Sequence, residues 1–173
     1  MARSRVIDTD RGFEGVKRRL RAAKGLAVKV GVLGGEQKDG AELGTTVAEV
    51  AMWNEFGVPG GPGRPAIPSR PAFRRAAEAS KPSLRILAKA ETAAVIDGTR
   101  TPQQALGRMG LFIQGAIQQE IVDLRTPPNA PSTIAAKGSS NPLIDTGQLK
   151  NSVTYEVVET AKIRDAGRIG GRR

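Results

Sequence analysis

The sequence predicts an α+β fold: a small, mainly antiparallel sheet packed against a long helix and shorter helices, with an extended Pro/Gly-rich arm and basic termini. Two segments, Val28 to Leu33 and Val153 to Val157, alternate apolar residues with a period of two, which is typical of strands with one buried face. Between them, residues 102–124 repeat apolar side chains at steps of three and four, which predicts a helix with one core-facing stripe. We expect the two strands to share a sheet and this helix to pack across it.

The chain length of 173 residues matches a single domain and is long enough to bury a core. We expect residues 1–159 to form this domain, including the Pro/Gly-rich arm at 57–71 and a long loop at 126–144. Residues 160–173 have too little apolar content to fold alone, which predicts a basic C-terminal tail.

The chain contains neither Cys nor His, and this restricts its chemistry. Without Cys it has no disulfide or thiolate nucleophile, and without His it lacks the commonest general base and transition-metal ligand. We therefore expect no enzymatic activity, no cofactor and no metal site. No run of about 18 apolar residues is present, and the start of the chain lacks the apolar segment of a signal peptide. We expect no membrane contact and retention in the compartment of synthesis.

The net charge of +10 is concentrated at the two ends of the chain. Residues 1–25 hold eight Lys/Arg against three Asp/Glu, and residues 160–173 hold five against one. Basic ends of this kind are either solvated tails or contacts for a polyanion. Because the tail has no aromatic residues, any contact with nucleic acid would be electrostatic and independent of sequence. The candidate contacts to DNA or to an acidic partner are Arg164, Arg168, Arg172 and Arg173.

The first predicted helix spans residues 11–24, with Asp10 as its cap. Phe13, Val16 and Leu20 recur at helical spacing, and basic residues occupy the rest of the surface. We interpret this pattern as a core-facing stripe with a solvated basic face; a DNA-binding helix is the alternative.

After a polar loop at residues 36–44, Thr46 and Glu49 have the spacing of a capping box. The helix that they begin runs to Phe56, and Gly57 is placed to end it.

Beyond the arm, we expect a short helix from Pro71 through Ala79 that Pro82 interrupts, followed by a resumed helical pattern up to Gly98. The strongest helix follows, with Thr101 as cap, Pro102 in the first turn and Gln104 completing a second capping box. Its apolar stripe consists of Leu106, Met109, Ile113, Ile117, Ile121 and Leu124. Three glycines within this helix predict that a neighbouring backbone approaches it closely. They are Gly107, Gly110 and Gly115. On the same helix, we expect Glu120 and Asp123 to form a solvated edge rather than a metal or acid/base pair.

The loop at 126–141 is too long for a simple connector, which favours a functional or a disordered segment. It leads to a short helical turn for which Asp145 or Thr146 is the expected cap. Asp145, Thr146 and Gly147 also match the catalytic triplet of aspartic proteases, but those enzymes need two such carboxylates. Because helical residues follow directly, we favour the cap.

Residues Trp53 to Phe73, WNEFGVPGGPGRPAIPSRPAF, form the most specialised stretch of the chain and hold five of its eleven prolines. Proline fixes φ and extends its predecessor, so we expect a stiff, polyproline-like arm with glycines at its bends. An ordinary surface loop is the alternative. Ile67 is an isolated apolar residue, and Arg64 and Arg70 flank it with charged groups suited to a carboxylate or phosphate. This combination predicts a loop that docks on a partner, with interface residues Trp53, Asn54, Phe56, Arg64, Ile67, Pro68, Arg70 and Phe73.

Two segments together resemble the tail-completion and neck proteins of long-tailed bacteriophages, a group that includes minor tail protein Z-like and Mu-like virion morphogenesis proteins. In that group an Asn-Glu-Phe-Gly turn leads through Pro and Gly residues to an Ile-Pro-x-Arg-Pro-Phe stretch. A later Leu-x-Asp-Thr-Gly-x-Leu segment precedes a final strand. The residues that match are Asn54, Glu55, Phe56, Gly57, Ile67, Pro68, Arg70, Pro71 and Phe73, and later Leu143, Asp145, Thr146, Gly147 and Leu149. This chain departs from the pattern in its longer arm and in Ala72, which stands between Pro71 and Phe73.

The resemblance implies a non-enzymatic structural subunit of the virion, located at the neck or tail top after assembly in the host cytoplasm. It implies a homo-oligomeric ring, with a hexamer expected, around the DNA channel. The expected partners are neighbouring neck and tail proteins such as a tail terminator or a head-tail connector, and genomic DNA by nonspecific contact. The alternative function is a nonspecific DNA-binding protein that uses its basic termini.

Overall fold

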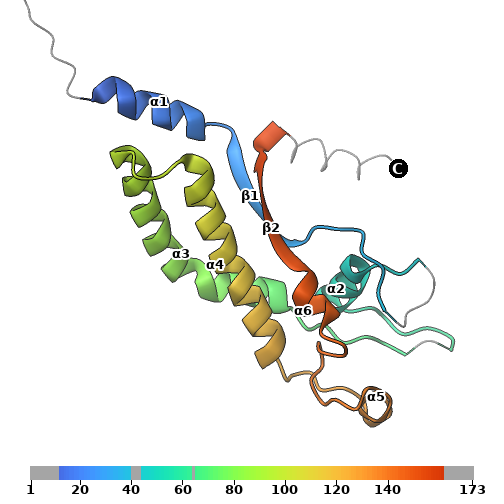
Figure 1. Cartoon of the computed structure of the whole chain (residues 1–173). Helices are drawn as coiled ribbons and strands as arrows, with labels where there is room; N and C mark the ends of the chain where they lie inside the picture. Colours follow the sequence, from blue (N-terminus) through green and yellow to red (C-terminus); the bar gives the residue numbers. More distant parts are fainter. Residues whose placement is uncertain (1–11, 40–43, 64, 162–173) are drawn as a thin grey trace, which may run out of the picture.

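The computed structural model describes residues 12–39, 44–63 and 65–161 and confirms the α+β fold (Figure 1). In chain order its elements are α1 (Phe13–Ala23), β1 (Leu26–Val32), α2 (Val47–Phe56), α3 (Ala72–Asp97), α4 (Pro102–Asp123), α5 (Pro131–Lys137), α6 (Gln148–Ser152) and β2 (Val153–Glu159). Within these described ranges, no helix combines the length and apolarity needed to cross a bilayer.

The sheet consists of β1 and β2, which pair antiparallel from Leu26 opposite Glu159 to Val32 opposite Val153. This confirms both predicted strands and their shared sheet. As predicted, α4 packs across the sheet. Strand side chains, and not the neighbouring backbone that the sequence predicts, approach it closely at Gly110. A Cβ atom there would lie 2.6 Å from Cδ2 of Tyr155 and 2.8 Å from Cγ2 of Val28. The helix needs a glycine at this position because strand side chains fill the space.

The core lies where α2, α3, α4, α6 and β2 meet, and its largest fully buried side chains are Val47, Ile121 and Val153. The apolar stripe of α4 is buried in its second half, at Ile117, Ile121 and Leu124. Its first half is only partly buried. The stripe is therefore confirmed as the side of α4 that enters the core.

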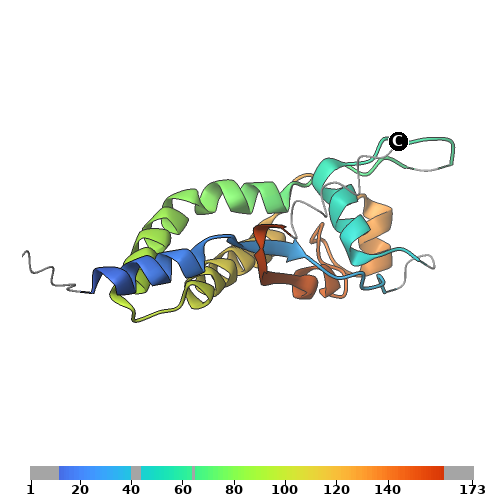
Figure 2. The ribbon, with the colours of Figure 1, turned by 90° about the horizontal axis from the view of Figure 1, so that it is seen from above.

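The predicted break at Pro82 is wrong, because α3 runs unbroken through it for 26 residues. A proline within a helix removes one N–H and presses on the carbonyl four residues earlier, which bends the helix without necessarily ending it. Figures 1 and 2 show that α3 is bent along its length. The α3–α4 pair is joined by the buried carboxylate of Glu91, which binds Arg100 Nη1 and Arg108 Nε at 2.7 Å each.

Both predicted capping boxes are present, Thr46 with Glu49 at α2 and Thr101 with Gln104 at α4. The predicted side-chain cap at residues 145–146 is wrong. Gly147, and not residue 145 or 146, occupies the N-cap position of α6. Thr146 still contacts the start of the helix, since its Oγ1 accepts a long hydrogen bond of 3.4 Å from the Gln148 amide.

The core-facing stripe expected in α1 is also wrong, since Phe13 is 65% exposed and Leu20 is 47% exposed. α1 lies along one end of the α3–α4 pair, where too little protein surrounds it to bury a full stripe (Figure 2). Arg19 anchors it by donating from Nη2 to the Ile96 carbonyl at 2.5 Å. The helix begins after Gly12, and the expected cap Asp10 lies outside the described residues.

Candidate functional site

The Pro/Gly-rich arm forms a hairpin that projects from the body at the C-terminal end of α2 (Figures 1 and 2). We call residues 58–67 the hairpin. Its base is closed by two backbone hydrogen bonds of 2.9 Å between Val58 and Ile67, one in each direction. Gly57 turns the chain into the hairpin with φ of 77°, and a Cβ there would lie 3.0 Å from the Ile67 carbonyl oxygen. Both observations require glycine at this position.

Arg70 fastens the base of the hairpin to the loop that follows α4. Its side chain is only 6% exposed, and burial lowers the pKa of the guanidinium. It donates to the carbonyl of Pro127 at 2.9 Å, and to the Pro128 carbonyl and Asn129 Oδ1 at 3.0 and 3.2 Å. The structure thus corrects the expected placement of Arg70, which lies inside the chain's own fold.

Asn54 belongs to the same internal network. Its backbone carbonyl accepts a hydrogen bond from the Arg70 amide at 2.5 Å, and its Oδ1 accepts from Arg70 Nη1 at 3.4 Å. Its side-chain amide also donates to the Val50 carbonyl at 2.9 Å. Asn54 therefore joins the end of α2 to the return strand of the hairpin.

Glu55 joins α2 to α3. The residue is buried, with 8% of its surface exposed, and its carboxylate accepts from the backbone amides of Phe73 and Arg74 at 3.0 Å each. These amides belong to the first turn of α3, where a helix has unpaired N–H groups and favours negative charge. This role could not be predicted from local sequence patterns, because Glu55 bonds the first turn of a helix that begins well after it in the chain.

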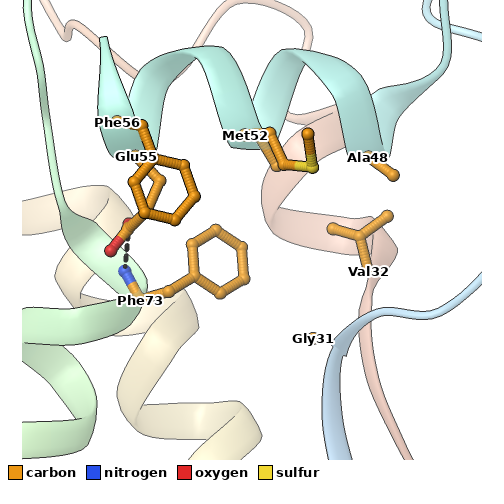
Figure 3. A pocket seen from close by; sticks show the side chains of 8 residues that line it. Gly31, Val32, Ala48, Met52, Glu55, Phe56 and Phe73 are labelled. Atoms are coloured by element: carbon orange, nitrogen blue, oxygen red, sulfur yellow. Dashed lines mark hydrogen bonds between the residues drawn. The ribbon is translucent and has the colours of Figure 1, made fainter. Parts of the chain in front are cut away.

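On the exposed side of this network, an apolar groove lies between α2, β1 and the start of α3 (Figure 3). We call it the aromatic groove; its volume is about 240 Å³, and its lining is Gly31, Val32, Ala48, Ala51, Met52, Glu55, Phe56 and Phe73. Figure 3 shows the rings of Phe56 and Phe73 on one side, with Val32 and Ala48 across from them. Phe56 is 70% exposed and Met52 is 57% exposed.

The groove offers apolar contact and little reactive chemistry. Its only ionisable lining residue is Glu55, whose carboxylate already bonds the α3 amides and lies 3.7 Å from Arg74 Nε. Its volume is below the roughly 300–1,000 Å³ of typical small-molecule pockets. The arrangement suits a few apolar side chains from another polypeptide.

The predicted interface residues that the structure describes therefore divide into three groups. Phe56 and Phe73 both line the aromatic groove. Trp53, which lies on α2 with Phe56, is 37% exposed. Ile67 is half-buried at the hairpin base and Pro68 is exposed, whereas Asn54 and Arg70 are internal. The remaining predicted contacts, Arg64, Arg164, Arg168, Arg172 and Arg173, lie outside the described residues.

The three other acidic residues that the sequence singles out make contacts within the fold. Glu120 lies 2.7 Å from Arg75 Nε, and Asp123 accepts from Gln119 at 2.9 Å. Asp145 lies 3.6 Å from Lys38. Over the part of the chain that the structure describes, no three or more acidic side chains gather as a metal site would require.

Comparisons with protein-family models, with curated proteins and with solved structures found no match.

Proposed function

We propose that this chain is a structural subunit of the neck of a long-tailed bacteriophage, where it completes the tail and joins it to the head. The observation that carries the proposal is a projecting hairpin, held at its base by an internal hydrogen-bond network, beside an aromatic groove that is open to solvent. Such a pair of features serves docking between polypeptides.

The geometry gives a physical reason for the motif through which the chain resembles neck proteins. Asn54, Glu55, Gly57 and Arg70 fix the end of α2, the base of the hairpin and the start of α3. Phe56 lies between these structural positions in the sequence and points into the groove (Figure 3). The same motif thus fixes the backbone around the hairpin base and supplies an aromatic side chain to the groove.

In this proposal the chain acts by assembly and not by catalysis. It forms a ring, with six copies expected, around the channel through which DNA passes, and it contacts neighbouring neck proteins such as a tail terminator or head-tail connector. An open aromatic surface fits this role, since aromatic residues are enriched in the cores of protein interfaces.

Electron microscopy of particles from a phage that encodes this chain, grown with the coding segment deleted, tests the proposal. We expect DNA-filled heads and separate tails, with joined particles restored by the wild-type chain supplied in trans. Normal joined particles in the deletion lysate would disprove the proposed function.

The second candidate function is nonspecific binding to duplex DNA, and the surface of α1 favours it. Arg18 and Arg21 on this helix and Lys24 at its C-cap are exposed and add to the basic ends of the sequence. Binding of this kind weakens steeply as salt rises, because it releases counterions from the phosphates. Salt-dependent binding by the isolated chain, lost on deletion of residues 160–173 and weakened by R18Q/R21Q/K24Q, would support this candidate.

A further inference from the structure

The hairpin and the aromatic groove are neighbours in the chain, but the hairpin points away from the body and leaves the groove uncovered. Figures 1 and 2 show this direction from two perpendicular views. The network of Asn54 and Arg70 fixes the base of the hairpin, so the hairpin is held in that orientation. One molecule therefore carries two docking features that do not meet within it.

The chemistry of the hairpin matches that of the groove. Its described residues are Val58, Pro59, Gly60, Gly61, Pro62, Gly63, Pro65, Ala66 and Ile67, none of which is acidic. The three prolines are exposed and preset their own φ angles, which reduces the conformational entropy lost when the hairpin docks. Proline-rich segments with these properties dock in aromatic-lined grooves.

We propose that the aromatic groove receives the hairpin of a second copy of this chain. The inference rests on the proposed function, since it names the contact by which the copies of a ring would bind one another. Each copy then contributes a hairpin to one neighbour and a groove to the other. This contact is heterologous, and repetition of a heterologous contact builds a ring when the rotation between copies closes.

Disulfide trapping tests the contact directly, because the chain has no Cys and only introduced thiols can react. The variant A48C places a thiol in the groove lining, and A66C places one on the exposed part of the hairpin. A disulfide requires the two Cα atoms to come within about 7 Å. We expect the mixed single variants to form a disulfide-linked heterodimer on oxidation, and A48C/A66C to form a ladder of longer species.

Two matched controls separate this contact from random collision. S83C carries an exposed thiol on α3 outside the groove and should link to A66C at least about tenfold less than A48C does. The substitution F56D, added to A48C, should reduce the heterodimer to the S83C level. The substitution I86D should leave the yield of heterodimer unchanged, because Ile86 does not line the groove. Ile86 is a matched position because it is 72% exposed and Phe56 is 70% exposed. Circular dichroism confirms that each variant is folded.

Three results would overturn the inference: no heterodimer, equal linkage by S83C and A48C, or an intramolecular disulfide in A48C/A66C without a ladder. The phage deletion experiment distinguishes this failure from failure of the proposed function. If the deletion lysate contains unjoined particles but no disulfide-linked heterodimer forms, only the hairpin-to-groove contact is rejected. Joined particles in the deletion lysate would reject the proposed function whatever the trapping shows.

Discussion

Arg70 joins the base of the hairpin to the loop that follows α4. Its guanidinium is buried and donates to two carbonyls and an amide oxygen from residues 127–129. Removal of the charged donor leaves these acceptors without their partner, and hydrogen bonds to charged groups are worth about 1.5–3 kcal/mol each before relaxation. We expect R70M to lower the free energy of unfolding by about 2–4 kcal/mol, measured by urea denaturation.

The control for this prediction is R85M, which removes an exposed arginine from α3. Exposed substitutions of this kind usually change stability by less than about 0.5 kcal/mol. Equal stability of R70M and R85M would show that the Arg70 network does not hold the hairpin base.

Two glycines of α4 provide a matched test of close packing. A Cβ at Gly110 would collide with Tyr155 and Val28, whereas a Cβ at Gly115 meets nothing within 4 Å. Alanine gains up to about 1 kcal/mol of helix propensity over glycine at either position. We expect G115A to stabilise the protein by about 0.5–1 kcal/mol, and G110A to destabilise it by about 1–3 kcal/mol because of overpacking. Thermal unfolding measures both, and a stabilising G110A would contradict the packing of α4 on the sheet.

At the scale of elements, the capping box of α2 makes stability depend on pH. The Thr46 amide and hydroxyl bond the Glu49 carboxylate and lower the pKa of this group below its usual 4.5. A depressed pKa means that the stabilisation is present above pH 4.5 and is lost as the pH falls through the pKa of the folded state.

The variant E49Q tests this dependence, because Gln keeps the acceptor of the capping box but carries no charge. We expect wild type to be more stable than E49Q near pH 7, and the difference to close as the pH falls below 4.5 and through the lowered pKa of Glu49 in the folded state. Thermal unfolding across this range measures the difference. A difference that stays constant with pH would mean that the Glu49 charge does not stabilise α2.

The elements that the sequence predicts correctly are those with local signals. Both capping boxes lie within four residues, and the strand alternation and the α4 stripe repeat over short distances. The errors depend on distant neighbours. Whether Phe13 and Leu20 are covered depends on how far α3 and α4 extend, and whether Pro82 ends a helix depends on the packing around it.

The same distinction applies to the candidate site. The sequence marks residues 53–73 as special, and Phe56 and Phe73 do meet in one groove. It does not show that Arg70 turns inward, because its acceptors at residues 127–129 are brought alongside only by the tertiary fold. Val32 and Ala48 line the groove for the same reason, since β1 and α2 approach each other only in the folded chain.

At the scale of the whole molecule, the hairpin and α1 lie at opposite ends (Figure 2). The hairpin end carries the aromatic groove, and the α1 end carries exposed basic residues together with Phe13 and Leu20. If copies associate through the hairpin and the aromatic groove as we propose, the basic end stays available for a polyanion or an acidic neighbour.

The groove is expected to matter for association and not for the stability of one chain. Phe56 is 70% exposed, so F56D should change the free energy of unfolding by less than about 0.5 kcal/mol. I86D, at a similarly exposed apolar position outside the groove, should match it in stability but should not affect association. A large loss of stability in F56D would show that Phe56 belongs to the core.

Sedimentation velocity of the full chain over a range of concentrations tests the central claim most directly. We predict that the mass of the wild type and of I86D rises with concentration from 18.3 kDa to multiples of it, while F56D remains at 18.3 kDa. A wild-type chain that stays at 18.3 kDa at every concentration would contradict association through the hairpin and the aromatic groove.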